Sequence, residues 1–265
     1  MSIKQTVFAV GAHPDDVEFN MAGTLSLLAK AGFEPHMMNV ARSNLDSNEL
    51  PEAEITRIRR REAERSAAVL GAVYHPPIVD DMMIFYEDKL LRQILAVVRQ
   101  LRPTIVLLPS PNDYMEDHTN TARLVVTACF GRGMRHWLSD PPRAHTGQDV
   151  YLYHAQPHLN RDGMRNLVTP ELFVNITGEM DTKLRMLGCH ESQRQWLDET
   201  QGIDNYLESM RQSGVEVARM AARDGWQYAE GFRRHSHVGF SRQDRDLLAE
   251  VLGDNVDRRS STAAG

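Results

Sequence analysis

Short β-rich runs alternate with segments of helical spacing along the first half of the chain, and this alternation leaves few possible folds. Buried strands are predicted at residues 6–10, 36–40 and 104–108, with a short one beginning at Val73. Helices are predicted at 21–30, in a charged stretch that ends at Leu70, at 90–101 and at 119–130. Strands that alternate with helices of this length are typical of a parallel sheet covered on both faces. We therefore predict an α/β fold with a mainly parallel central sheet.

The second half of the chain is harder to interpret. Strands are predicted at 150–153 and 172–176, and helices at 180–189 and 202–223. A chain of 265 residues can bury one sizeable core, and no repeat or linker divides it. We expect one domain over residues 1–265. The polar end, from about residue 255 to 265, has nothing to bury and is expected to be a flexible tail.

Charge and composition exclude several classes of function. A net charge of −6 gives no electrostatic footprint for nucleic acid or an anionic membrane. We predict no membrane partner, because no apolar run of about 18 residues and no signal peptide are present. Two cysteines, Cys129 and Cys189, cannot form a disulfide framework, and free thiols favour the cytoplasm. The expected partner is a small molecule, and the oligomeric state stays open, a homo-oligomer included.

Two acidic, histidine-bearing loops follow predicted strands. His13-Pro14-Asp15-Asp16 comes directly after the first strand, and the loop after the 104–108 strand ends at Asp117-His118. In open α/β sheets, ligands bind beyond the carboxyl ends of the strands, where the strand order reverses. If the order is 3-2-1-4-5, these two loops face each other at that point.

His13, Asp16 and His118 would form a set of two histidines and one carboxylate. A catalytic zinc keeps three protein ligands and leaves the fourth position to water, whose pKa it lowers to about 7. A neighbouring carboxylate, here Asp15, could take the proton of that water. Local hydrogen bonds of a plain turn are the alternative interpretation of His13 and Asp16.

The run Ala12–Glu18 resembles the signature of the LmbE-like, or PIG-L, zinc-dependent N-deacetylases. Weaker matches follow in the family's order, over about residues 5 to 235. They are Arg59–Glu62 with Ala67–Gly71, Asp117-His118, Lys183 with His190-Glu191-Ser192-Gln193, and Tyr228–Phe232.

The resemblance implies a Rossmann-like three-layer fold, one zinc per chain, and hydrolysis of the N-acetyl group of an amino sugar or sugar conjugate. It implies that His13, Asp16 and His118 hold the metal, and that Asp15 is the general base. Arg59 stands where family members often place an arginine that contacts substrate.

One departure from the family pattern concerns the leaving group. Met115 stands where many members have a histidine that stabilises the oxyanion or protonates the amine. The acid could then be Tyr114, His190 or His154. We favour His190, because histidine exchanges protons near neutral pH. Tyr114 is better suited to bind substrate through a hydrogen bond.

A second departure concerns substrate choice. Residues 41–46 replace the Gly-rich loop that commonly faces substrate in the family.

Three alternatives remain open. A metal-dependent hydratase could use the same metal and base to add water to a double bond. A non-haem iron oxygenase could use the same two histidines and carboxylate, although such sites usually occur in β-barrels. A sugar-binding protein without activity would not need a spare base at Asp15.

Overall fold

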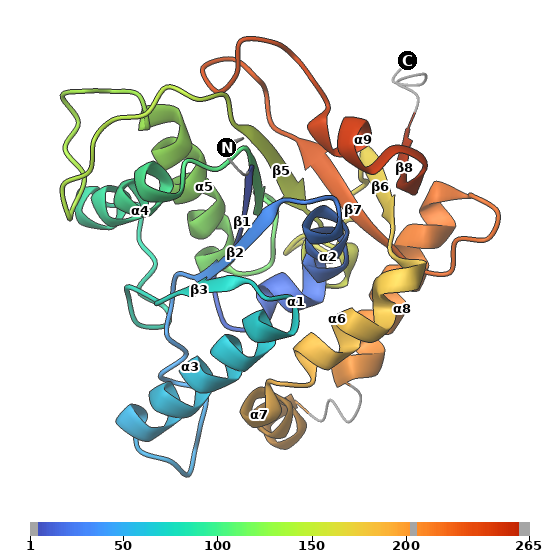
Figure 1. Cartoon of the computed structure of the whole chain (residues 1–265). Helices are drawn as coiled ribbons and strands as arrows, with labels where there is room; N and C mark the ends of the chain where they lie inside the picture. The colour runs from blue at the N-terminus through green and yellow to red at the C-terminus, as the bar shows by residue number, and fades with distance from the viewer. Residues whose placement is uncertain (1–4, 202–205, 260–265) are drawn as a thin grey trace.

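The computed structural model describes residues 5–201 and 206–259, and its centre is one eight-stranded sheet (Figure 1). The strand order is β3-β2-β1-β4-β5-β7-β6-β8. The strands are β1 (Thr6–Gly11), β2 (Glu34–Asn39), β3 (Val73–His75), β4 (Ile105–Leu108), β5 (Tyr151–Ala155), β6 (Leu172–Asn175), β7 (Ala229–Arg234) and β8 (Val256–Arg258).

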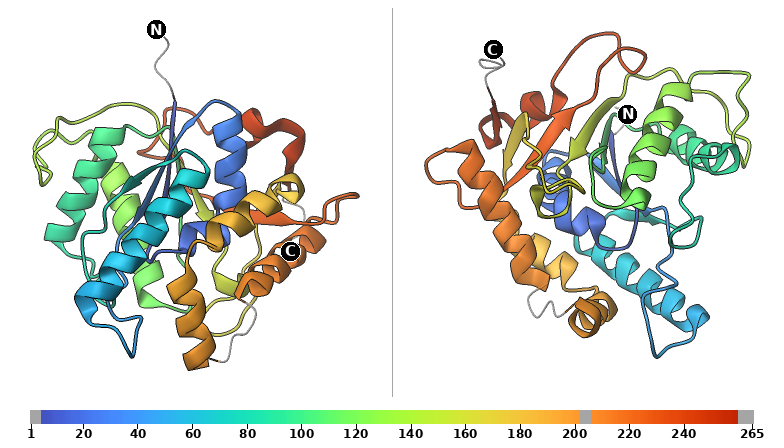
Figure 2. Two further views of the ribbon diagram at one scale, coloured as in Figure 1. Left: turned by 60° about the horizontal axis from the view of Figure 1, so that its bottom comes forward. Right: turned by 180° about the vertical axis from the view of Figure 1, so that it is seen from behind.

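Helices cover both faces of this sheet, as Figure 2 shows. The α-helices are α1 (Asp16–Asn20), α2 (Ala22–Lys30), α3 (Glu52–Val69), α4 (Asp88–Leu101), α5 (Glu116–Gly131), α6 (Met180–Leu187), α7 (Glu191–Gln201), α8 (Tyr206–Ala221) and α9 (Leu247–Leu252). Short 3₁₀ turns are η1 (His158–Asn160), η2 (Thr177–Glu179) and η3 (Gly253–Asn255).

Alternate side chains of β1 enter two different cores. Val7 and Ala9 pack in a core shared with α2 and α6, whereas Phe8 and Val10 pack in a core shared with α4 and α5. Successive side chains of a strand point to opposite faces, so a strand that is apolar at every position must be covered twice. The predicted three-layer α/β fold is confirmed.

The direction of the strands changes across the sheet. The neighbours β3, β2, β1, β4 and β5 pair in parallel, in the predicted order. Beyond β5 the pairings with β7, β6 and β8 are antiparallel. This antiparallel part was not predicted from the sequence.

The expected tail from about residue 255 is wrong at its start. Val256–Arg258 forms β8, which pairs with β6 through Val174 and Val256. Ladder hydrogen bonds satisfy the backbone of this polar segment, so it joins the sheet edge without a core of its own. Residues 260–265 lie outside the described part of the chain.

The helical predictions in the second half need two adjustments. The predicted helix 180–189 ends at Leu187, and α7 follows it at Glu191. The predicted helix 202–223 corresponds to α8, which begins at Tyr206, whereas residues 202–205 lie outside the described residues. Across the described ranges, no helix has the length and apolarity needed to cross a bilayer.

The sheet brings two loops together. β1 lies between β2 and β4, and all three run in the same direction. The segments that leave their carboxyl ends therefore emerge at one edge of the sheet, and strand order reverses between β1 and β4.

Candidate active site

Asp16 shapes the turn that follows β1. Its Oδ2 accepts hydrogen bonds from the backbone N–H groups of Ala12, at 2.7 Å, and His13, at 2.9 Å. Gly11 makes this close turn possible, because a Cβ there would come 2.7 Å from the Cβ of Asp16. Burial would raise the pKa of Asp16, but His118, His13 and the two N–H donors hold it below its ordinary value. Asp16 is therefore an ionised carboxylate.

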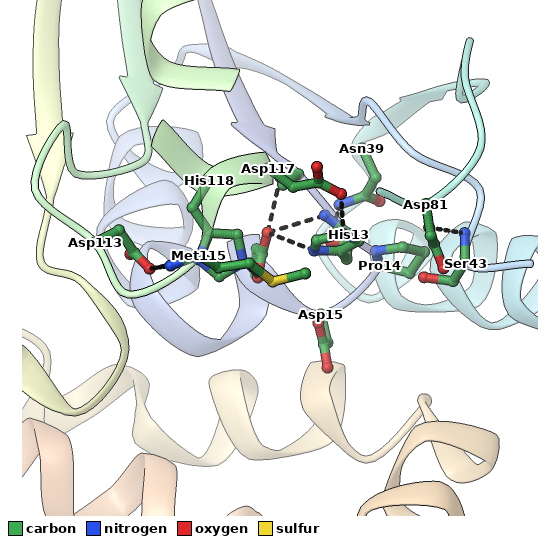
Figure 3. A network of polar contacts seen from close by, with 12 residues as sticks. His13, Pro14, Asp15, Asn39, Ser43, Asp81, Asp113, Met115, Asp117 and His118 are labelled. Carbon is green, nitrogen blue, oxygen red and sulfur yellow. Dashed lines mark hydrogen bonds and ion pairs between the residues drawn. The ribbon is translucent and has the colours of Figure 1, made fainter. Parts of the chain in front are cut away.

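The structure brings the three predicted ligands into one cluster, of which Figure 3 labels His13 and His118. One ligand atom from each of His13, Asp16 and His118 lies within 4.8 Å of the others. The Nε2 of His118 is 3.4 Å from the Oδ1 of Asp16. Two ligands of a tetrahedral zinc are separated by ~3.4 Å, given metal–ligand distances of about 2.0–2.1 Å. The donor set and its spacing fit a metal ion.

Two further carboxylates orient the histidines. Asp117 Oδ2 lies 3.0 Å from His13 Nε2, and Asp113 Oδ1 lies 2.8 Å from His118 Nδ1. The backbone N–H of Met82 also donates to Asp117, at 2.9 Å. Each imidazole thus has one nitrogen held by a carboxylate and the other directed at the cluster, the usual arrangement of metal-binding histidines.

Neither outer carboxylate was assigned a role from the sequence. A signal existed, because Asp113 and Asp117 stand in the same loop as His118 and an outer carboxylate commonly accompanies a metal-binding histidine.

Asp15 stands beside the cluster in an unusual backbone conformation. Its φ of 109° is rare for a residue with a side chain. The side chain is directed away from the other labelled residues in Figure 3, and its Oδ2 accepts a hydrogen bond from the hydroxyl of Tyr206 on α8. Burial raises the pKa of Asp15, and the Arg59 guanidinium opposes this rise. Strained backbone of this kind is frequent at functional sites.

Arg59 is buried against the turn that follows β1 and bonds its backbone. Its side chain is fully buried and donates to the carbonyl of Pro14, at 3.0 Å, and to the hydroxyl of Ser43, at 3.1 Å. It also pairs with Asp46, at 3.3 Å, and bonds Gln193 on α7. This geometry gives Arg59 a positioning role, and its contact with a substrate stays a prediction.

His190 and His154 are both buried and both engaged by the protein. His190 Nε2 lies 3.0 Å from Glu18 Oε1. His154 bonds the carbonyl of Pro109 through Nδ1 and His235 through Nε2, each at 3.0 Å. Their roles as the acid stay predictions.

Tyr114 is at the rim of the site. Its ring meets His118 edge-on, with a centroid distance of 5.5 Å, and much of it is exposed. This position suits the predicted contact with a substrate, which remains to be tested.

Sequence reasoning missed a third histidine near the cluster. His158 lies in η1, directly after β5, with its ring 4.5 Å from Phe19 and 6.0 Å from Tyr114. β5 is parallel to β4, so the turn after it emerges at the same edge of the sheet. The position of His158 soon after a predicted strand was the signal that could have identified it as a site residue.

Part of the chain matches a known protein family. Residues 8–129, which include the metal-ligand candidates and Asp15, match the family described as GlcNAc-PI de-N-acetylase, PIG-L. The chain carries a PIG-L domain. The diacetylchitobiose deacetylase of Thermococcus kodakarensis is 27% identical over 194 residues, which cover 71% of this chain and 69% of that protein.

A second relative is named as a hydratase rather than a deacetylase. The 4-oxalmesaconate hydratase of Pseudomonas putida is 24% identical over 246 residues, covering 87% of this chain and 89% of that protein.

Solved structures show the same fold. The 4-carboxy-2-hydroxymuconate hydratase of Pseudomonas putida superposes with a TM-score of 0.72 at 24% identity, covering 92% of this chain and 100% of that one. The N,N'-diacetylchitobiose deacetylase of Pyrococcus horikoshii also gives 0.72, at 21% identity, over 92% and 88% of the two chains.

Proposed function

We propose that this protein is a zinc-dependent amidohydrolase that removes an N-acetyl group from an amino sugar or sugar conjugate. The observation that carries the proposal is the cluster of His13, Asp16 and His118, with ligand atoms within 4.8 Å of one another. The two outer carboxylates support it, because they leave His13 Nδ1 and His118 Nε2 for a metal. The PIG-L domain and the named deacetylases among its relatives support the reaction class.

The proposed chemistry divides the acidic pair. A zinc bound by the cluster would supply a Lewis acid and an acidified water. Asp16 would help to hold the metal, and Asp15 would take the proton released when water adds to the acyl carbon. That proton is then available to the amine nitrogen when the C–N bond breaks. Tyr206 occupies only Oδ2 of Asp15, and among the described residues no hydrogen bond engages Oδ1. Oδ1 is therefore the oxygen that we assign to the proton.

The proposal includes zinc as the metal and the cytoplasm as the compartment. The donor set of two imidazoles and a carboxylate suits zinc, and it also suits iron. The sheet with helices on both faces is unlike the β-barrels that usually hold such iron sites, which supports zinc. Cys129 and Cys189 are unpaired, which supports a reducing compartment.

A hydratase is the second candidate. Its support is the likeness to the 4-oxalmesaconate hydratase along 87% of the chain, together with Met115 at the place of the expected histidine. Adding water to a double bond needs the same metal and base, but it releases no amine that must be protonated.

One assay separates the two candidates. Protein reconstituted with zinc is incubated with N,N'-diacetylchitobiose, with conjugates of N-acetylglucosamine, and with 4-oxalmesaconate. We expect equimolar acetate and free amine from at least one amide, abolished by chelation and restored by zinc. Turnover of the unsaturated acid alone would replace the proposal with the hydratase. The His118→Ala variant is the control for contaminating activity.

A further inference from the structure

We infer that His158 contacts the substrate and donates a ring N–H to the acyl oxygen at the reacting carbon, a donor that Met115 cannot provide. The inference rests on the proposed function. A tetrahedral intermediate needs hydrogen-bond donors aimed at its oxyanion. The thioether of Met115 has no such donor.

Aromatic contacts connect His158 both to the candidate metal ligand His118 and to the residue that bonds Asp15. The centroid of its ring lies 6.0 Å from the ring centroid of Tyr114, which in turn lies 5.5 Å from that of His118. The same centroid lies 4.5 Å from the ring centroid of Phe19, which lies 6.2 Å from that of Tyr206.

The hydroxyl of Tyr206 donates to Asp15. A series of pairwise contacts therefore links His118 through Tyr114, His158, Phe19 and Tyr206 to Asp15. We therefore expect a substrate whose carbonyl lies between the candidate metal ligands and Asp15 to have His158 as a neighbour.

Among the described residues, neither ring nitrogen of His158 has a hydrogen-bond partner, whereas each of three neighbouring histidines has one nitrogen engaged. His13 is held by Asp117, His118 by Asp113, and His190 by Glu18. Among the described residues, no hydrogen bond or ion pair engages the His158 ring, which is partly exposed. A polar ring packed between aromatic side chains without a protein partner is suited to a partner from the substrate.

The turn that carries His158 is anchored from α8. The two residues after it have left-handed backbone, with φ of 52° at Leu159 and 58° at Asn160. The buried Asn160 amide donates to Glu216 Oε2, at 2.8 Å, and Arg161 pairs with Glu216 Oε1, at 3.1 Å. A side-chain donor is effective only when its position is fixed before the reaction. Neither residue with positive φ is glycine, so the turn is held at a cost in backbone strain.

The inference is tested with His158→Ala, His158→Gln and the exposed His136→Gln as the matched control. Loss of one oxyanion donor lowers kcat on the order of 10²–10³-fold. We expect that loss in His158→Ala with KM little changed, partial rescue in His158→Gln because its amide still donates, and no change in His136→Gln. Zinc content and melting temperature are measured for each variant.

A second readout does not depend on turnover. Acetate, the proposed product, is titrated into each zinc-loaded protein by calorimetry, and we expect about tenfold weaker binding in His158→Ala, as for loss of one hydrogen bond. Unchanged acetate affinity in His158→Ala, or no acetate binding by the wild type, overturns the inference. If the wild type cleaves no amide, the proposed function fails, and the acetate comparison still decides the role of His158.

Discussion

The hydroxyl of Tyr206 donates a hydrogen bond to Asp15, from a position 191 residues further along the chain. This contact ties the turn after β1 to α8, and both residues are buried. Tyr206 also contacts Phe19 on α1, so Asp15, Tyr206 and the Phe19 ring are linked by direct contacts. The neutral tyrosine stabilises the carboxylate form of Asp15 and so lowers its pKa, against the effect of burial.

Removing this hydrogen bond should move the pH dependence of turnover. In Tyr206→Phe the carboxylate form of Asp15 loses a donor, so its pKa rises. The acidic limb of the kcat profile should move to higher pH by about one to two units, since a hydrogen bond to a charged group contributes roughly 1.5–3 kcal/mol. Turnover is measured from pH 5 to 9, with zinc content checked. An acidic limb at the wild-type position would show that the contact does not tune the base.

Replacing the base itself should separate catalysis from metal binding. Asp15→Asn is nearly isosteric but cannot take a proton, so turnover should fall on the order of 10²–10⁴-fold. Zinc content, measured by mass spectrometry, should stay at one per chain. Loss of zinc in Asp15→Asn would make Asp15 a ligand and reverse the assignment of the acidic pair.

The outer carboxylates should matter for metal affinity. Asp117→Asn removes the negative partner of His13 Nε2 and should weaken zinc binding about 10- to 100-fold, the usual effect of such a loss. The control is Glu116→Gln, which changes an exposed acid one residue away. Competition with a chromogenic chelator gives both affinities. Equal affinities in the two variants would remove Asp117 from the metal site.

Much of the cluster of His13, Asp16 and His118 could be predicted from the sequence for a physical reason. β1 and β4 are mainly apolar runs followed by polar loops. The ends of these strands can therefore be predicted from the sequence. The order of neighbouring parallel strands then sets which loops meet.

The residues that were missed depend on long-range contacts. His158 stands in a turn in which Leu159 and Asn160 have left-handed backbone. Neither residue is a glycine, so the sequence does not indicate the turn. Tyr206 reaches Asp15 only because α8 packs over the turn after β1. β8 is a polar segment of three residues, and its pairing with β6, not its own composition, makes it a strand. No local pattern carries this information.

Stability should depend on pH through His154. Burial lowers the pKa of His154 to about 4 in the folded protein, from an ordinary value of 6.5. Between these values the unfolded chain binds more protons, so stability is complete above pH 6.5 and is lost as the pH falls toward 4. The loss from this group should reach about 3 kcal/mol.

Chemical denaturation at pH 7 and pH 4.5 tests this dependence. His154→Gln should lose less stability than the wild type between the two pH values. The exposed His136→Gln should behave as the wild type. Identical losses in His154→Gln and the wild type would contradict the assignment.

The metal content of purified protein tests the proposed centre most directly. Wild type, His118→Ala and the control His136→Gln are purified without chelator, incubated with zinc, freed of excess ion and measured by inductively coupled plasma mass spectrometry. With three protein ligands there is no redundancy, so we expect one zinc per chain in the wild type and control, and a content near zero in His118→Ala. Full zinc occupancy in folded His118→Ala, or a wild type that retains no zinc, would contradict the proposed metal centre.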